Sequence, residues 1–187
     1  MSQIAIKGAT TGTGVFTLES PATNTDRTLV LPDEAGTVLT SATPVVAQKG
    51  VPAFSAYLGS GQSISADTPT KVEYNTEIFD ATGAYDHTTY RFQPDVAGYY
   101  AVGGYLRLDA VSLTSRALAV YKNGSRYQNN TVYFASTAGR TEVHCNIYLN
   151  GSTDYVELYA TATGYTATAS NGSGQQTLFY GHLVSAA

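Results

Sequence analysis

The side chains that could bind a metal or act as a nucleophile are few and far apart in this sequence. The three histidines, His87, His144 and His182, are not set at His-x-x-x-His or Cys-x-x-Cys spacing and match no common metal-ligand motif. The single cysteine, Cys145, falls on the apolar face of an alternating stretch, residues 143–149, as expected for an inert buried thiol. We therefore predict no metal site and no cofactor.

The 14 acidic residues do not single out a catalytic pair. A glycosidase needs two carboxyl groups about 5 to 9.5 Å apart, and the chain has no Gly-x-Ser-x-Gly motif, phosphate-binding loop or dinucleotide fingerprint. Asp80 and Asp86 flank a predicted turn, where they could hold a calcium ion or cap the turn, and capping is the better account. We predict no catalytic residues and no enzyme, with a capsular polysaccharide depolymerase as the enzymatic alternative.

The composition is that of a β-sheet protein with a neutral, hydrogen-bonding surface. Only 13% of the residues are charged, and the chain has 15 Tyr and 18 Gly but no Trp. A net charge of -4 gives no basis for binding nucleic acid, which usually requires a basic patch. No apolar run approaches the ~20 residues that span a bilayer, and the N-terminus lacks a signal-peptide pattern. We expect folding in a cytoplasm, without membrane insertion.

Short runs of alternating apolar and polar residues recur along the chain between Gly, Asn, Asp and Pro, which predicts an all-β fold. In residues 99–109 the even-numbered positions are predicted to face the core. Asn123-Gly124 between two such runs predicts a β-hairpin. Residues 160–176, rich in Thr, Ala, Ser and Gly, instead predict a mobile connection before the last strand.

Residues 1–43 differ from the rest, because three short strand-like stretches are separated by turn residues. Three short strands cannot bury a core alone. We therefore expect other proteins or other copies of this chain to cover them. Residues 27–40, RTLVLPDEAGTVLT, resemble segments common in bacteriophage fibre and tail proteins. This resemblance implies a small β-rich attachment segment over residues 1–43 and a linker over 44–52. Its predicted virion-attachment residues are Val15, Phe16, Leu18, Leu29, Leu31, Val38 and Leu39.

A second resemblance covers roughly residues 53–185. Its signals are Gly83, Tyr85-Asp86, Phe92, Gly98-Tyr99-Tyr100, Lys122-Asn123-Gly124 and Phe179-Tyr180-Gly181-His182-Leu183. In this order and spacing they resemble the globular head of complement component one q, which shares a jelly-roll β-sandwich with tumour necrosis factor. The sequence has no collagen-like Gly-x-y repeat, and Pro94 stands where the family commonly has a cysteine. The resemblance implies a jelly-roll head over residues 53–187.

The same resemblance implies a homotrimer, because heads of this family pack side by side around an axis. The chain also has more tyrosines than one sandwich can bury with every hydroxyl bonded. Ordinary surface exposure is the alternative explanation for them. The tyrosines predicted to lie between subunits are Tyr57, Tyr99, Tyr105, Tyr148 and Tyr159.

Together the two resemblances imply a structural and adhesive bacteriophage virion protein, assembled in the host cytoplasm as a trimeric tail fibre, head fibre or spike. Its partners would be itself, other virion proteins through the N-terminal segment, and a polysaccharide or protein on the host cell surface. A capsid decoration or head-fibre protein that adorns the shell is the alternative. The predicted receptor-binding residues are Tyr127, Asn129, Asn130, Tyr133 and Tyr165.

Overall fold

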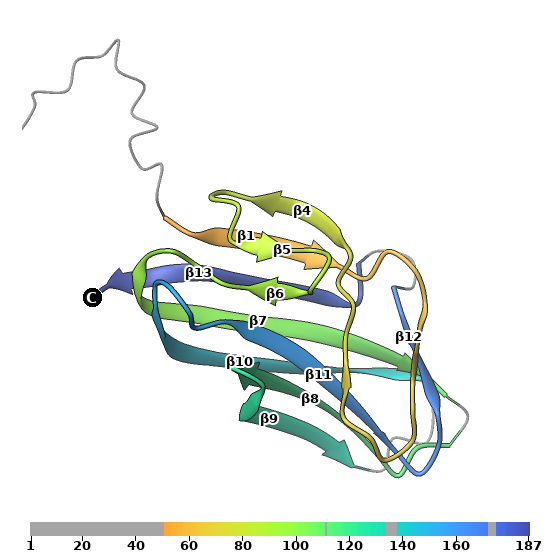
Figure 1. Cartoon of the computed structure of the whole chain (residues 1–187). Coiled ribbons are helices and arrows are strands. Elements are labelled where there is room, and N and C mark those ends of the chain that lie inside the picture. Colours follow the sequence, from red (N-terminus) through yellow and green to blue (C-terminus); the bar gives the residue numbers. More distant parts are fainter. Residues whose placement is uncertain (1–50, 111, 134–137, 172–174) are drawn as a thin grey trace, which may run out of the picture. The chain divides into compact units, whose positions relative to one another are not determined.

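The computed structural model describes residues 51–110, 112–133, 138–171 and 175–187, which form strands and turns only (Figure 1). This confirms the all-β prediction. The strands are β1 (Ala53–Tyr57), β2 (Gln62–Ile64), β3 (Thr70–Lys71), β4 (Thr76–Asp80), β5 (Tyr85–Asp86), β6 (Arg91–Phe92), β7 (Ala97–Asp109), β8 (Ser115–Lys122), β9 (Ser125–Tyr133), β10 (Gly139–Asn150), β11 (Val156–Thr163), β12 (Ala167–Ser170) and β13 (Leu178–Ala186).

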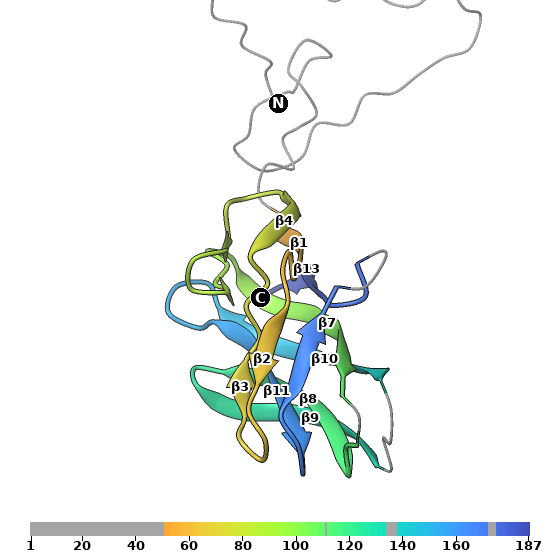
Figure 2. The same cartoon turned by 90° about the vertical axis from the view of Figure 1, so that its right-hand side faces the viewer.

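The strands form two antiparallel sheets. Sheet A has the strand order β2-β12-β7-β13-β1-β4, and β10 pairs with the other edge of the long strand β7. Figure 2 shows the short strand β2 beside β12 at one end of this sheet. Sheet B has the order β5-β6-β11-β8-β9, and β3 also pairs with β11. The inner faces of the two sheets enclose one apolar core.

The core is centred on aromatic side chains. The Phe54 ring stacks on Tyr85 and Phe92 with centroid distances of 4.7 and 4.4 Å, and Phe179 meets it edge-on at 4.7 Å. Gly181 lies over this cluster, where an added Cβ would stand 3.0 Å from the Phe54 ring. Even-numbered positions of β7 are buried from Gly98 to Leu108, which confirms the predicted inner face.

Turn chemistry also follows the predictions. Asn123 and Gly124 have φ angles of 51° and 77° and connect β8 to β9, which confirms the hairpin. The Asp80 carboxylate accepts hydrogen bonds from the backbone N–H groups of Thr82, Gly83 and Tyr85. Hydrogen bonds from Thr88 and then Thr89 hold the pKa of the Asp86 carboxyl well below its usual range. Both carboxylates therefore cap turns.

The sandwich has two distinct ends. The described chain begins at Val51 beside its C-terminus, since the Leu183 N–H donates to the Pro52 carbonyl (3.0 Å) and the Ala187 N–H to the Ala97 carbonyl (3.0 Å). We call this the proximal end (left in Figure 1). The last residues of β7 and β9, the first residues of β8 and β10, and the β11–β12 connection lie at the opposite, distal end.

The prediction of a mobile connection over residues 160–176 is wrong for residues 160–170, and residues 172–174 lie outside the described residues. β11 continues to Thr163, and β12 then pairs with both β7 and β2. The inward positions here are the alanines Ala160, Ala162, Ala167 and Ala169, all of which are buried. These alanines alternate with Thr and Ser at the two-residue period of a strand. A segment rich in Ala, Thr and Ser nevertheless has the composition of a loop, which is why the strand was not predicted.

The attachment residues predicted in residues 1–43, Val15, Phe16, Leu18, Leu29, Leu31, Val38 and Leu39, lie outside the described residues. The boundaries of the attachment segment, linker and head stay predictions. Among the residues that are described, no helix is long and apolar enough to cross a bilayer.

Candidate functional site

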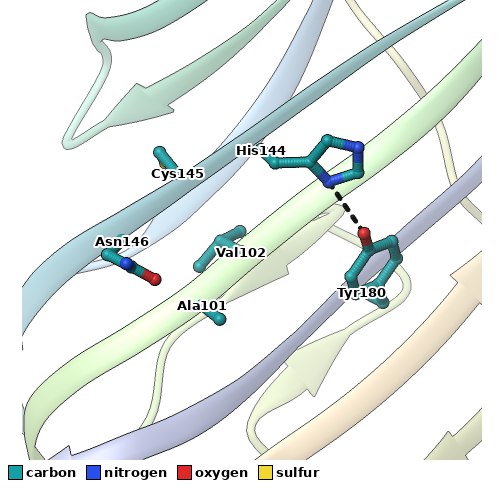
Figure 3. A pocket seen from close by; sticks show the side chains of 6 residues that line it. All are labelled: Ala101, Val102, His144, Cys145, Asn146 and Tyr180. Carbon is teal, nitrogen blue, oxygen red and sulfur yellow. Dashed lines mark hydrogen bonds between the residues drawn. The ribbon is translucent and has the colours of Figure 1, made fainter.

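The outer face of sheet A has a floor of small residues between larger polar side chains. In β7, Ala101 and Gly103 face outward, and strand register places them opposite Asn146 and His144 of β10 and His182 and Tyr180 of β13. A shallow hollow of ≈ 260 Å³ lies here (Figure 3). It is lined by Ala101, Val102, His144, Cys145, Asn146 and Tyr180.

A hydrogen bond between two aromatic side chains borders the hollow. The Tyr180 hydroxyl and His144 Nδ1 are 2.8 Å apart, and Figure 3 shows the two rings converging from β13 and β10. Burial raises the pKa of Tyr180 to about 12, so the phenol keeps its proton at neutral pH. Gly103 lies beneath this pair, and an added Cβ there would stand 2.4 Å from His144 Nδ1 and 3.1 Å from the Tyr180 oxygen. The hydrogen bond therefore depends on a glycine below it.

Cys145 also borders the hollow but is half-buried and free. Burial raises the pKa of its thiol to about 11, which leaves it protonated and a poor nucleophile. The described residues contain no group of three His, Cys, Asp or Glu side chains placed to hold a metal ion.

Tyrosines surround the hollow. Tyr99 and Tyr148 face each other edge-on at 5.5 Å and are 55% and 41% exposed. Tyr105 lies on the other side, near both Tyr180 and His144. Tyr57 of β1 belongs to the same outer face, since it pairs with Leu178, which pairs with Tyr105. Four of the five tyrosines predicted to lie between subunits thus share one face of the sandwich.

The fifth, Tyr159, lies on the other sheet. It stacks on Tyr121 at a centroid distance of 4.1 Å on the outer face of sheet B. The sequence pattern marks outward positions on each strand but does not say to which sheet a strand belongs. Tyr159 therefore does not share the outer face of sheet A with the other four tyrosines.

The residues predicted to bind a receptor are divided as well. Tyr127 and Asn130 reach from β9 toward β10, where they donate to the carbonyls of Asn146 (3.3 Å) and Glu142 (2.7 Å). Asn129 and Tyr133 point the other way, since they pair with the outward residues Ala119 and Ser115 of β8. Tyr165 lies in the β11–β12 connection at the distal end.

Two of these residues lie at the distal end. Tyr133, the last residue of β9, is 68% exposed, and Tyr165 is 55% exposed. Residues Ser125–Asn130 of β9 are exposed on both faces of the strand, which is unusual in a sandwich. A second hollow of ≈ 250 Å³ lies between β9 and β10. It is lined by Gln128, Asn129, Asn130, Glu142, Val143 and His144. The sequence predicted neither hollow, because each depends on how distant strands pair.

Solved structures with the same arrangement of strands identify the fold. No family model matches the sequence, and a search of curated proteins finds no match. The globular domain of zebrafish complement 1qA superposes with a TM-score of 0.56 over 73% of this chain and 99% of that one, at 16% identity. The described domain is a jelly roll of the complement one q and tumour-necrosis-factor type.

Two further structures give similar values. Murine APRIL, solved at pH 8.0, matches with a TM-score of 0.56 at 9% identity, covering 72% of this chain and 99% of that one. The PRD1 vertex protein P5 matches with a TM-score of 0.56 at 14% identity, covering 73% and 99%. These likenesses confirm the predicted jelly-roll fold.

Proposed function

We propose that this chain is a structural and adhesive bacteriophage virion protein, a homotrimeric spike or fibre that binds a host-surface polysaccharide or protein through its jelly-roll head. The observation that carries the proposal is the polarity of the sandwich. The described chain begins at the proximal end, and the exposed Tyr133 and Tyr165 lie at the distal end. A head held by its N-terminal segment presents the distal end away from its attachment.

The outer face of sheet A is the proposed contact between copies. It carries Tyr57, Tyr99, Tyr105 and Tyr148 around a hollow floored by small residues. Tyrosine is enriched in interfaces because a large ring is buried at low cost in conformational entropy while its hydroxyl still finds a partner. Packing this face against neighbouring copies leaves the outer face of sheet B directed away from them.

Adhesion then depends on several weak contacts acting together. Three identical heads on one axis present the same receptor-binding residues in parallel, so linked binding strengthens attachment by about a hundredfold or more without any new contact. We propose that Tyr133 and Tyr165 contact the receptor at the distal end and that Tyr127, Asn129 and Asn130 extend this surface along β9. The N-terminal segment, with its seven predicted attachment residues, would bind other virion proteins.

The second candidate is a capsid decoration or head-fibre protein. The likeness to a vertex protein of PRD1 favours a place on a virus particle and is compatible with a position on the shell. Electron microscopy of particles labelled on this chain would separate the two, since a fibre adhesin at the tail and a shell protein are found at different sites.

Binding of the purified full chain to host cells tests the proposed adhesin. The double variant Tyr133→Ala/Tyr165→Ala should weaken cell binding by at least tenfold, because each ring is lost three times per trimer. Ile78→Thr is the matched control, since Ile78 is 46% exposed but lies on the edge strand β4 of sheet A. Equal binding by the wild type and the double variant would count against the distal surface, and no binding by the wild type would contradict the adhesin.

A further inference from the structure

The outer face of sheet B carries a buried carboxylate bound by two cations. Glu157 of β11 is only 1% exposed, and its Oε1 accepts hydrogen bonds from Arg91 Nε (2.7 Å) and Lys71 Nζ (3.0 Å). The side chains of Arg91 and Lys71 themselves remain 38% and 29% exposed. One anion thus fixes two cations that still reach the surface.

Strand pairing places a third cation on the same face, farther across the sheet. Glu157 pairs with Tyr121 of β8, and Tyr121 pairs in turn with Arg126 of β9. The three side chains therefore lie on one face, with about 5 Å between directly paired neighbours and Arg126 two strands from Glu157. Arg126 is exposed, and within the described part of the chain it has no ion pair. The group formed by Lys71, Arg91 and Arg126 exceeds Glu157 by two positive charges, on a chain whose net charge is -4.

Asp86 also lies beside this group and lowers its excess from two positive charges to one. Asp86 of β5 pairs with Arg91 in register, but its two oxygens accept hydrogen bonds from Thr88 and Thr89. Only Nε of Arg91 is used by Glu157, and among the described residues no protein acceptor meets its Nη atoms. Arg91 therefore keeps the paired N–H groups that bind a carboxylate with two parallel hydrogen bonds.

Tyrosine rings border the cations. The Arg91 guanidinium lies 4.2 Å from the centroid of the Tyr155 ring, and Tyr121 and Tyr159 stack at 4.1 Å with 28° between their planes. We call this group the basic-aromatic patch, made of Lys71, Arg91, Tyr121, Arg126, Tyr155 and Tyr159. Beyond it the same face continues through Asn129 and Ala119 to Tyr133 at the distal end.

We propose that the basic-aromatic patch binds a carboxylate-bearing sugar of an acidic host-surface polysaccharide. This inference rests on the proposed adhesin and names the chemical class of its receptor. The Arg91 guanidinium binds the planar carboxylate of one sugar, the tyrosine rings pack against the sugar ring, and Arg126, three strands away on the same face, binds the carboxylate of a further sugar. Asn129, and farther along β9 Tyr133, contact later sugars of the same glycan toward the distal end. Positive charge on this face of an acidic chain selects an acidic over a neutral glycan.

The test is titration of the purified full chain with an oligosaccharide of glucuronic acid, and with the same oligosaccharide after its carboxyl groups are reduced to alcohols. The acidic form should bind at least tenfold more tightly, and its affinity should fall as salt is raised from low to physiological concentration. Arg126→Gln should weaken binding of the acidic form by about tenfold, because it removes a charged contact. Arg126 makes no ion pair with Glu157, so this change leaves the ion pairs of Glu157 with Lys71 and Arg91 intact.

Arg140→Gln is the matched control. Arg140 lies over the Tyr105 ring at 4.9 Å on sheet A, so the same charge is removed beside a tyrosine on the other face. Equal affinity for the acidic and reduced forms, or equal losses in the two variants, would overturn the proposal. Equal binding of a sulfated polysaccharide or duplex DNA would also overturn it, since it would indicate general attraction of polyanions. If cells are bound but the acidic sugar is not, this inference fails while the adhesin stands.

Discussion

Replacing Gly103 by alanine should destabilise the head by about 2 to 3 kcal/mol. The new Cβ would stand 2.4 Å from His144 Nδ1 and 2.8 Å from the Val143 carbonyl oxygen. The His144 ring can rotate away, but only by giving up its hydrogen bond with Tyr180, worth about 1 kcal/mol. The carbonyl belongs to β10, which pairs with β7 along its length, so relieving that contact shifts backbone and adds about 1 to 2 kcal/mol, in the range of overpacking.

Urea unfolding followed by circular dichroism at a fixed protein concentration measures this change. The midpoint should fall while the slope of the transition stays the same, since the surface exposed on unfolding does not change. Gly61→Ala is the control, because its Cβ would meet its nearest neighbour at an ordinary 3.4 Å. We expect that variant to stay within about 0.5 kcal/mol of the wild type. An unchanged midpoint for Gly103→Ala would refute the packing described around the hollow.

Three further predictions concern the core and the turns. Phe54→Ala should cost about 3 to 5 kcal/mol by removing the central ring of the aromatic cluster, as measured by the loss in thermal or urea stability. Gly124→Ala should cost about 1 kcal/mol in the same assay, because φ is 77° while the nearest atom is 3.8 Å away. Lys122, then Asn123, hold the pKa of Asp154 below its usual value. Asp154→Asn should therefore destabilise the protein at pH 7, and the difference should shrink as the pH falls below about 4 toward the lowered folded value. A difference that does not depend on pH would contradict this assignment.

Local sequence patterns predicted the features that depend on neighbouring residues. The even-numbered positions of β7 and the Asn123-Gly124 hairpin follow from a two-residue period and from turn chemistry, both of which act over a few residues. β12 escaped prediction because its inward residues are alanines, whose alternation with Thr and Ser gives little hydrophobic contrast.

Features that join distant strands could not be predicted in this way. Tyr159 and Tyr99 lie on different sheets, and the local sequence of a strand does not determine which sheet the strand joins. The basic-aromatic patch contains Lys71, Arg91 and Arg126. These residues share one face of sheet B only because β3, β6 and β9 pair with the strands between them. Long-range register is set by the whole fold, and a scattered set of cations in the sequence gives no sign of it.

The central claim is that copies of this chain associate through the outer face of sheet A. Light scattering of the full chain at micromolar concentration tests it most directly, alongside Ala101→Glu, which places a charge on the floor of the hollow. We predict a wild-type mass three times the chain mass of 19.7 kDa, and a lower mass for a variant that keeps its β-sheet circular dichroism. A monomeric wild type, or a variant that remains trimeric, would contradict the account.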